Sequence, residues 1–183
     1  MKELRFHGRR EPRYDRVAPF VAAPRLLAEA ALREGKHVQF RPPWLFLRGF
    51  TPETALLRVD REPIETYQQE SFLDAVVVTD PTIVSEVNVV TGLKPGGLLL
   101  VNGEGPVALT GKARVITRDL SGIAKAHKAE LTAALLGAVI GLTKLVRLET
   151  AERLLKGAAG RDRAVKANLA ALHAGFESTR GKE

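Results

Sequence analysis

The stretch "DAVVVTDP", residues 74–81, decides the predicted fold. Its apolar residues run without interruption from Ala75 to Val78, and polar residues and a proline follow at once. A short unbroken apolar run with such an ending is typical of a strand that is buried on both faces, as in a parallel sheet. The rest of the predicted fold extends outward from this strand.

Segments with the patterns of strands and helices alternate on both sides of this run. Further strands are predicted at residues 2–7, 37–40, 54–60, 98–104 and 113–119. Helices are predicted from Pro24 to a glycine cap at residue 35, and at residues 82–87, 131–142, 150–156 and 162–178. Residues 8–22 are expected to be irregular, and "LKPGG", residues 93–97, is expected to form a turn. This alternation predicts an α/β fold with a mainly parallel sheet, flanking helices and a helical C-terminal segment.

The length and composition predict a single domain over residues 1–183. Hydrophobic residues make up 45% of the chain, which is an ordinary share for a globular protein. No apolar run reaches the roughly 18 to 20 residues that a membrane span needs. The charged N-terminus also lacks the apolar segment of a signal peptide. We therefore expect a cytoplasmic protein with no membrane partner.

The chain contains no cysteine. This excludes disulfides and any iron–sulfur cluster held by this chain, because such clusters are held mainly by thiolates. The four histidines, His7, His37, His127 and His173, lie far apart and lack the spacing of metal ligands. We expect no metal site.

The positive charge is concentrated in the first third of the chain. Residues 1–61 hold 13 Lys and Arg against 7 Asp and Glu, whereas residues 62–183 hold 15 against 14. A basic surface can meet nucleic acid, an acidic protein or a phosphorylated cofactor. It can equally serve solubility alone, and the composition does not decide between these alternatives.

Polar residues follow the predicted strands, and the carboxyl ends of parallel strands share one edge, where ligands bind in this class of sheet. These strand ends are His7-Gly8-Arg9, Thr79-Asp80-Pro81, Asn102-Gly103-Glu104 and Thr117-Arg118-Asp119. We call this edge the carboxyl rim. Strands end at the surface in every protein of this class, so polar ends alone do not establish a site. We expect His7 to be hydrogen-bonded rather than catalytic, and Asp80 and Asp119 to cap helices rather than form a catalytic pair.

The common phosphate-binding and nucleophile motifs are absent. No G-x-G-x-x-G follows a strand, no G-x-x-x-x-G-K-[ST] is present, and no G-x-S-x-G is present. We therefore predict no catalytic residues in this chain and no self-sufficient enzyme.

Six stretches, taken together and in order, resemble the gamma subunit of the 2-oxoacid:ferredoxin oxidoreductases, the pyruvate/ketoisovalerate oxidoreductase catalytic domain family. The resemblance covers residues 3–178. The stretches are "LRFHGR" (4–9), "LLAEAALREGKHVQ" (26–39), "VVVTDPT" (76–82), "GLKPGGLLLVNGE" (92–104), "KARVITRD" (112–119) and "LLGAVIGLTKLVRLE" (135–149).

The resemblance implies a Rossmann-like domain within a larger complex. Such a complex oxidatively decarboxylates a 2-oxoacid, joins the acyl group to coenzyme A and reduces ferredoxin. Thiamine diphosphate and the iron–sulfur clusters lie mainly on the other subunits. The chain agrees with this division, because it has no cysteine and no G-D-G…N stretch.

The chain departs from the family at the first turn, which usually reads H-G-R-G-G-Q-G. Here His7, Gly8 and Arg9 match, but Glu11 adds a repelling charge and Pro12 removes an N–H donor, so a backbone phosphate nest is not expected. A second family pattern, E-R-R-G-A-P, matches only at Arg48 and Gly49. The residues predicted to contact a cofactor are His7, Gly8, Arg9, Arg10, Arg13, Asp80 and Asn102.

Two hypotheses for the first turn stay open. The guanidinium groups of Arg9, Arg10, Arg13 and Arg16 could replace the backbone donors and meet coenzyme A or an acidic subunit, because guanidinium binds phosphate bidentately. Alternatively, the turn has lost its ligand and the chain is a degenerate or regulatory relative.

The leading prediction for function is an accessory gamma-type subunit that is inactive alone, with the other subunits as partners and ferredoxin as an indirect partner. The alternative is a diverged binding module whose basic first third meets a nucleotide, nucleic acid or an acidic protein. Few aromatic residues lie among the N-terminal arginines, so nucleic acid is the weaker choice. A homo-oligomer is also compatible with the sequence. The proline-rich loop 41–53, with Trp44, Phe46 and Phe50, is expected to be core or interface.

Overall fold

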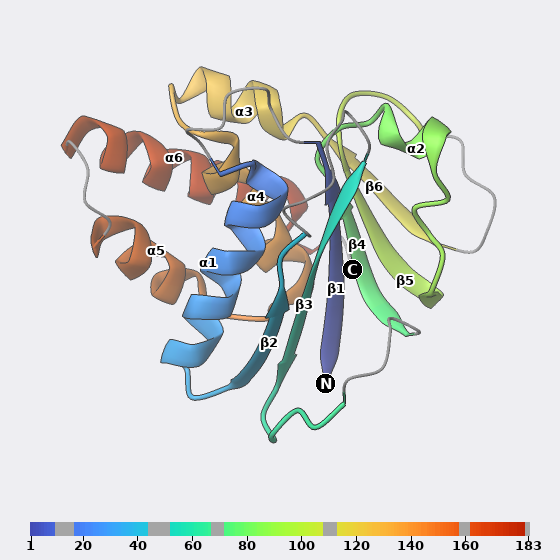
Figure 1. Cartoon of the computed structure of the whole chain (residues 1–183). Coiled ribbons are helices and arrows are strands. Elements are labelled where there is room, and N and C mark those ends of the chain that lie inside the picture. The colour runs from blue at the N-terminus through green and yellow to red at the C-terminus, as the bar shows by residue number, and fades with distance from the viewer. Residues whose placement is uncertain (10–16, 44–51, 67–71, 108–112, 158–161, 182–183) are drawn as a thin grey trace.

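The computed structural model describes residues 1–9, 17–43, 52–66, 72–107, 113–157 and 162–181. These residues form a six-stranded sheet with the strand order β2-β3-β1-β4-β5-β6 (Figure 1). The strands are β1 (Lys2–Gly8), β2 (His37–Arg41), β3 (Glu53–Asp60), β4 (Leu73–Val78), β5 (Leu93–Asn102) and β6 (Arg114–Arg118). The helices are α1 (Pro19–Arg33), α2 (Ile83–Glu86), α3 (Leu120–Ala126), α4 (Leu131–Thr143), α5 (Leu148–Gly157) and α6 (Asp162–Thr179).

The prediction of a mainly parallel sheet is confirmed. β1 pairs in parallel with β4, β4 with β5, and β5 with β6, whereas β3 is antiparallel to both β1 and β2. The stretch that led to the fold forms β4, which lies in the middle of the sheet and contributes to the cores on both faces. After β1 the chain moves to one side of the sheet, and after β4 it moves to the other. The junction of β1 and β4 is therefore the topological switch point.

The helices cover the two faces of the sheet unequally. Residues of α1, α3, α4, α5 and α6 pack together against one face and form the larger core. On the other face, α2 contributes Ile83 to a smaller core with residues of β3, β4 and β5. Figure 1 shows this arrangement, with α2 standing apart from the other helices. Among the described residues, no helix is both long enough and apolar enough to cross a membrane.

The first helix begins earlier than predicted. The prediction that Pro24 opens it was wrong, because Pro19 takes the first helical position and Phe20 and Ala23 extend the buried face. Pro24 lies inside the helix, where the missing N–H costs a hydrogen bond that the surrounding core offsets. The predicted end is confirmed, since Gly35 has a φ of +74° directly after the C-cap residue.

The predicted turn at residues 93–97 was also wrong. Leu93 pairs with Leu73 on β4, and the next pair joins Leu98 to Ala75. The intervening residues of β5 bulge out of the ladder, and Gly96 takes a φ of +74° there. Glycine and proline occur in bulges as well as in turns. Both structures need backbone angles that glycine allows, or a position where the N–H that proline lacks is not used.

Strand β1 carries charged side chains on a buried face. Leu4 and Phe6 belong to the larger core, whereas Glu3 and Arg5 alternate with them and are buried on the opposite side. Arg58 on β3, only 2% exposed, lies 3.0 Å from a carboxylate oxygen of Glu3. An ion pair this deep depends on both partners, because removing one leaves a buried charge unpaired.

Helices α4 and α6 pack with their backbones in close contact. A Cβ atom added to Gly137 on α4 would overlap the carbonyl oxygen of Leu172 on α6, and one on Gly175 would overlap that of Ala134. The Thr179 hydroxyl donates to the carbonyl oxygen of Ala138 at 2.9 Å. The glycines therefore set the distance between these helices.

We predict that Gly137→Ala lowers the free energy of unfolding by about 3 kcal/mol, because the added methyl meets backbone that cannot move aside. Gly157→Ala is the matched control, since its Cβ would meet no atom within 4 Å. Urea denaturation of both variants measures the difference. Equal losses in the two variants would contradict the packing described for α4 and α6.

Candidate functional site

The carboxyl rim is assembled as predicted. At the switch point, the backbone N–H and hydroxyl of Thr79 both donate to the carbonyl oxygen of His7, at 3.0 and 3.1 Å. At the next strands, the Gly103 N–H donates to the carbonyl oxygen of Arg118 at 2.9 Å. The ends of β1, β4, β5 and β6 thus meet along one edge.

Arg9 binds the segment that follows β4. Its Nε donates to Asp80 at 2.9 Å, and one Nη donates to the Thr82 hydroxyl at 3.2 Å and to Glu86 on α2. One guanidinium therefore bridges two carboxylates. Arg9 fixes α2 against the end of β1, and an incoming anion at this point would meet Asp80 and Glu86 as well as Arg9.

Asp119 caps a helix, as predicted, whereas the same prediction for Asp80 was wrong, because the N-cap of α2 is Thr82. Asp80 accepts from the N–H and the hydroxyl of Thr82, at 3.0 and 2.7 Å. Partial burial by itself would raise the pKa of Asp80, but the hydrogen bonds from Thr82 and Arg9 outweigh it and lower the pKa. Asp119 is the N-cap of α3 and accepts from the Gly122 N–H at 2.7 Å. Asp80 is thus held as a charged carboxylate with its oxygens engaged.

Asn102 joins three elements at the rim. Its Nδ2 donates to the carbonyl oxygen of Thr79 and to the Ser121 hydroxyl, both at 2.9 Å. Its Oδ1 accepts from the Ser121 N–H at 3.1 Å. The amide therefore links the ends of β4 and β5 to the start of α3, and these contacts use both amide hydrogens.

Gly8 is required for packing. A Cβ at this position would lie 2.7 Å from the Cβ of Phe20 and closer still to its ring, and Phe20 is fully buried at the start of α1. Gly8 is not among the residues with positive φ in the described chain. Its role is to let α1 approach β1, which differs from the anion contact that glycine makes in a phosphate-binding turn.

His7 is buried without a hydrogen bond. It is 5% exposed, and neither ring nitrogen has a partner among the described residues, so the expectation of a hydrogen-bonded histidine was wrong. Burial, and secondly the charge of Arg5, lowers the pKa of His7 to about 4. The imidazole is therefore neutral at pH 7, and His7 lies near the end of β1, where its carbonyl oxygen bonds Thr79.

Several predicted residues lie outside the described part of the chain. Arg10 and Arg13 are among them, as are Arg16 and the loop residues Trp44, Phe46, Arg48, Gly49 and Phe50. The sequence prediction in turn missed Thr82, Glu86 and Ser121. Glu86 lies six residues after Asp80, in the next short helix. This spacing was the available signal that one cationic side chain could contact both carboxylates.

The described rim provides a fixed framework. Arg9, Asp80 and Asn102 are engaged in hydrogen bonds within it, whereas the ring nitrogens of His7 have no partner among the described residues. The described residues hold no group of three metal-binding side chains. The chain offers no thiolate for a cluster, and the crowded Gly8 does not present the open backbone that a phosphate cradle needs.

We predict that His7 makes stability depend on pH. An unfolded histidine takes up a proton near pH 6.5, whereas folded His7 resists it until about pH 4. The contribution of His7 to the free energy of unfolding is therefore fully present above pH 6.5. It is lost as the pH drops toward 4, by about 3 kcal/mol in total. His7→Leu removes this component, and the exposed His127→Gln retains it. Denaturation curves at several pH values measure the difference, and identical pH profiles for parent and His7→Leu would contradict it.

Comparison with known proteins places the chain in a family. Residues 20–178 match the family described as pyruvate ferredoxin/flavodoxin oxidoreductase. A protein of Thermococcus litoralis named pyruvate/ketoisovalerate oxidoreductases common subunit gamma is 34% identical over 193 aligned positions. The alignment covers 98% of this chain and 97% of that protein.

Solved structures share the fold. The crystal structure of pyruvate oxidoreductase subunit PORC from Thermotoga maritima superposes with a TM-score of 0.79 at 30% identity, covering 96% of this chain and 95% of that one. A 2-oxoglutarate:ferredoxin oxidoreductase from Magnetococcus marinus has the same fold at 17% identity, with a TM-score of 0.76. It covers 97% of this chain but only 31% of its own. On the family match and these near full-length similarities, the chain belongs to the pyruvate ferredoxin/flavodoxin oxidoreductase family.

Proposed function

We propose that this chain is the gamma-type subunit of a 2-oxoacid:ferredoxin oxidoreductase. Such a complex converts a 2-oxoacid to acyl-coenzyme A by oxidative decarboxylation and reduces ferredoxin. The similarity to a separate gamma subunit over nearly the full length of both chains carries this proposal. The fold also occurs as about a third of a longer oxidoreductase chain, which supports its use as one unit of a larger assembly.

The chemistry of the chain supports a division of labour. It has no cysteine for a cluster and no thiamine-binding stretch, and its described rim has no open phosphate cradle. We therefore assign thiamine diphosphate, the iron–sulfur clusters and most of the coenzyme A site to the other subunits. Those subunits are the direct partners, ferredoxin is an indirect one, and the chain alone is inactive. A cytoplasmic location stays a prediction.

The carboxyl rim is the face that we assign to the partner subunits. Contact of a cofactor with His7, Gly8, Arg9, Asp80 and Asn102 stays a prediction, as does contact with Arg10 and Arg13. The hydrogen bonds of Arg9 and Asn102 support a structural role for these residues, which we call the framing role. In this role the residues hold the loops at the switch point in one arrangement, against which another subunit can dock.

We predict that 2-oxoacid-dependent and coenzyme A-dependent ferredoxin reduction requires this chain together with its partner subunits. Neither the isolated chain nor the complex without it should turn over. Within the complex, Arg9→Gln should lower turnover about tenfold, because α2 loses its anchor and the rim shifts. Arg33→Gln is the matched control, since Arg33 makes an exposed pair with Glu29 on α1.

The effect of each variant on turnover is measured by steady-state kinetics of complexes that are co-expressed and purified with that variant. Size-exclusion chromatography shows whether each complex assembles. Turnover by the isolated chain would contradict the division of labour. Full activity of the Arg9→Gln complex would contradict the framing role of the rim.

A further inference from the structure

The carboxyl rim carries more carboxylates than cations where α2 meets the ends of β1 and β5. Asp80 and Glu86 share the single guanidinium of Arg9. Glu104, in the segment after β5, is exposed, and no hydrogen bond or ion pair joins it to another described residue. One guanidinium therefore faces three carboxylates, in a chain whose formal net charge is +7. We call Arg9, Asp80, Glu86 and Glu104 the α2 corner.

Backbone packing connects the two halves of the α2 corner. A Cβ atom added to Gly103 would lie 3.3 Å from the side chain of Pro81, the residue that follows Asp80. The side-chain amide of Asn102 also donates to the carbonyl oxygen at the end of β4. The backbone that carries Glu104 is therefore held against the segment that leads from Asp80 into α2.

The charge of Arg118 is directed away from the α2 corner. Its carbonyl oxygen accepts from the Gly103 N–H, so its backbone lies beside the end of β5. Its Nε, however, donates to the carbonyl oxygen of Ser178 on α6 at 2.7 Å. Helix α6 packs on the face of the sheet opposite α2. Arg118 therefore does not offset the carboxylates of the corner.

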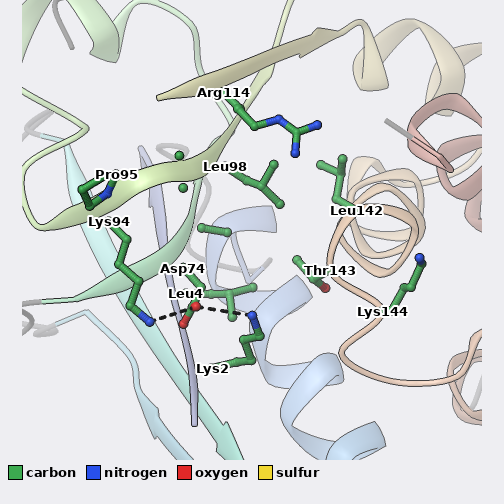
Figure 2. A pocket seen from close by; sticks show the side chains of 13 residues that line it. Lys2, Leu4, Asp74, Lys94, Pro95, Leu98, Arg114, Leu142, Thr143 and Lys144 are labelled. Atoms are coloured by element: carbon green, nitrogen blue, oxygen red, sulfur yellow. Dashed lines mark hydrogen bonds and ion pairs between the residues drawn. The ribbon is translucent and has the colours of Figure 1, made fainter. Parts of the chain in front are cut away.

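The opposite edge of the sheet has the reverse balance of charge. A hollow there is bordered by the first residues of β1, β4 and β5. Lys94 and Lys2 approach the same Asp74 oxygen, at 2.9 and 3.4 Å, and Figure 2 shows the carboxylate between them. Two ammonium groups thus share one carboxylate. The excess of carboxylates at the α2 corner is therefore not a general property of the edges of this sheet.

His7 lies on the same face of the sheet as α2, two residues before Arg9. It pairs with Val78, whose side chain belongs to the smaller core together with Ile83 of α2. Its ring is buried, and neither nitrogen has a hydrogen-bond partner among the described residues. A buried polar group without a partner costs free energy, and a ligand that the isolated chain lacks is one explanation. The neutral imidazole offers one acceptor nitrogen to such a ligand.

We propose that the α2 corner receives an arginine side chain of a partner subunit. The guanidinium lies between the carboxylates of Glu86 and Glu104, and one of its N–H groups donates to the ring of His7. Because His7 is only 5% exposed, a small local movement opens the surface above it on docking. This inference rests on the proposed function, since it gives a chemistry to the partner surface at the carboxyl rim.

The chemistry of the corner favours a guanidinium over other cations. Its planar fork carries five N–H donors, so it can serve two carboxylates and an imidazole at once, whereas an ammonium is a compact point charge. A metal ion is disfavoured, because the described residues hold no group of three side chains placed to ligate one. Placing one acidic corner on a basic chain also fixes the position at which a cationic partner group docks.

The test measures binding of the full chain to a complex of its partner subunits prepared without it, at several salt concentrations. Glu104→Gln should weaken association about fivefold and Glu104→Lys more than about tenfold, with both effects shrinking as salt rises. Neither change breaks a contact between described residues. Glu62→Gln and Glu62→Lys are the matched controls, because Glu62 is an exposed carboxylate that follows β3 at the opposite edge of the sheet. They should leave the association constant unchanged.

His7→Leu separates the hydrogen bond to the partner from the stability of the fold. The melting temperature of the isolated chain at pH 7 should not fall, because the variant removes a buried polar group that has no partner among the described residues. Association with the partner subunits should nevertheless weaken about fivefold, which is the loss of one hydrogen bond to a charged group.

Equal association constants for parent, Glu104→Gln and Glu104→Lys would overturn the proposal, while binding of the parent would leave the proposed function intact. Equal weakening by Glu62→Lys would overturn it as well, because the attraction would then be general. A lower melting temperature of the isolated Glu104→Gln chain would show that this carboxylate is paired within the chain, which also contradicts the proposal. Unchanged association of His7→Leu would overturn the contact with the ring. Failure of the parent to bind such subunits would instead refute the proposed function itself.

Discussion

The parallel pairing of β1 with β4 is the constraint on which the rest of the structure depends. The chain leaves this pair in opposite directions, so the pairing fixes both halves of the sheet and places α1 and α2 on opposite faces. It also brings the end of β1 next to Thr79 and Asp80. A sheet of this kind leaves a crevice at such a junction, and here Phe20 crowds Gly8 while Arg9 crosses to α2.

The two edges of the sheet differ in how their charges are used. At the carboxyl rim, Arg9 is paired with Asp80 and Glu86, and Asn102 links the ends of β4 and β5 to the start of α3. At the opposite edge, the bulge of β5 and the end of α4 border a hollow where Lys2 and Lys94 are both paired with Asp74. The first edge is suited to presenting a fixed shape to a protein. A chain without thiols can therefore serve a redox enzyme through its surfaces.

The sequence was sufficient where a local pattern has one physical meaning. The apolar run at 75–78 permitted only a buried element, and polar strand ends had to converge once the sheet was parallel. It failed where one signal serves two structures. Pro19 and Pro24 are both compatible with the start of a helix, and the glycines at 96 and 97 are compatible with a turn or a bulge. A glycine at position 8 can leave room for a bound anion or for the ring of a neighbouring aromatic residue. The hollow at the opposite edge of the sheet left no local signal, because Lys2, Lys94 and Lys144 are brought together only by folding.

Hydrogen–deuterium exchange of the chain, alone and within its assembled complex, tests most directly whether the carboxyl rim is the assembly surface. The account predicts that amides of residues 79–86 and 102–106 become protected on assembly, while those of residues 94–97 exchange as they do in the isolated chain. Protection of residues 94–97 with unchanged exchange at the rim would contradict it.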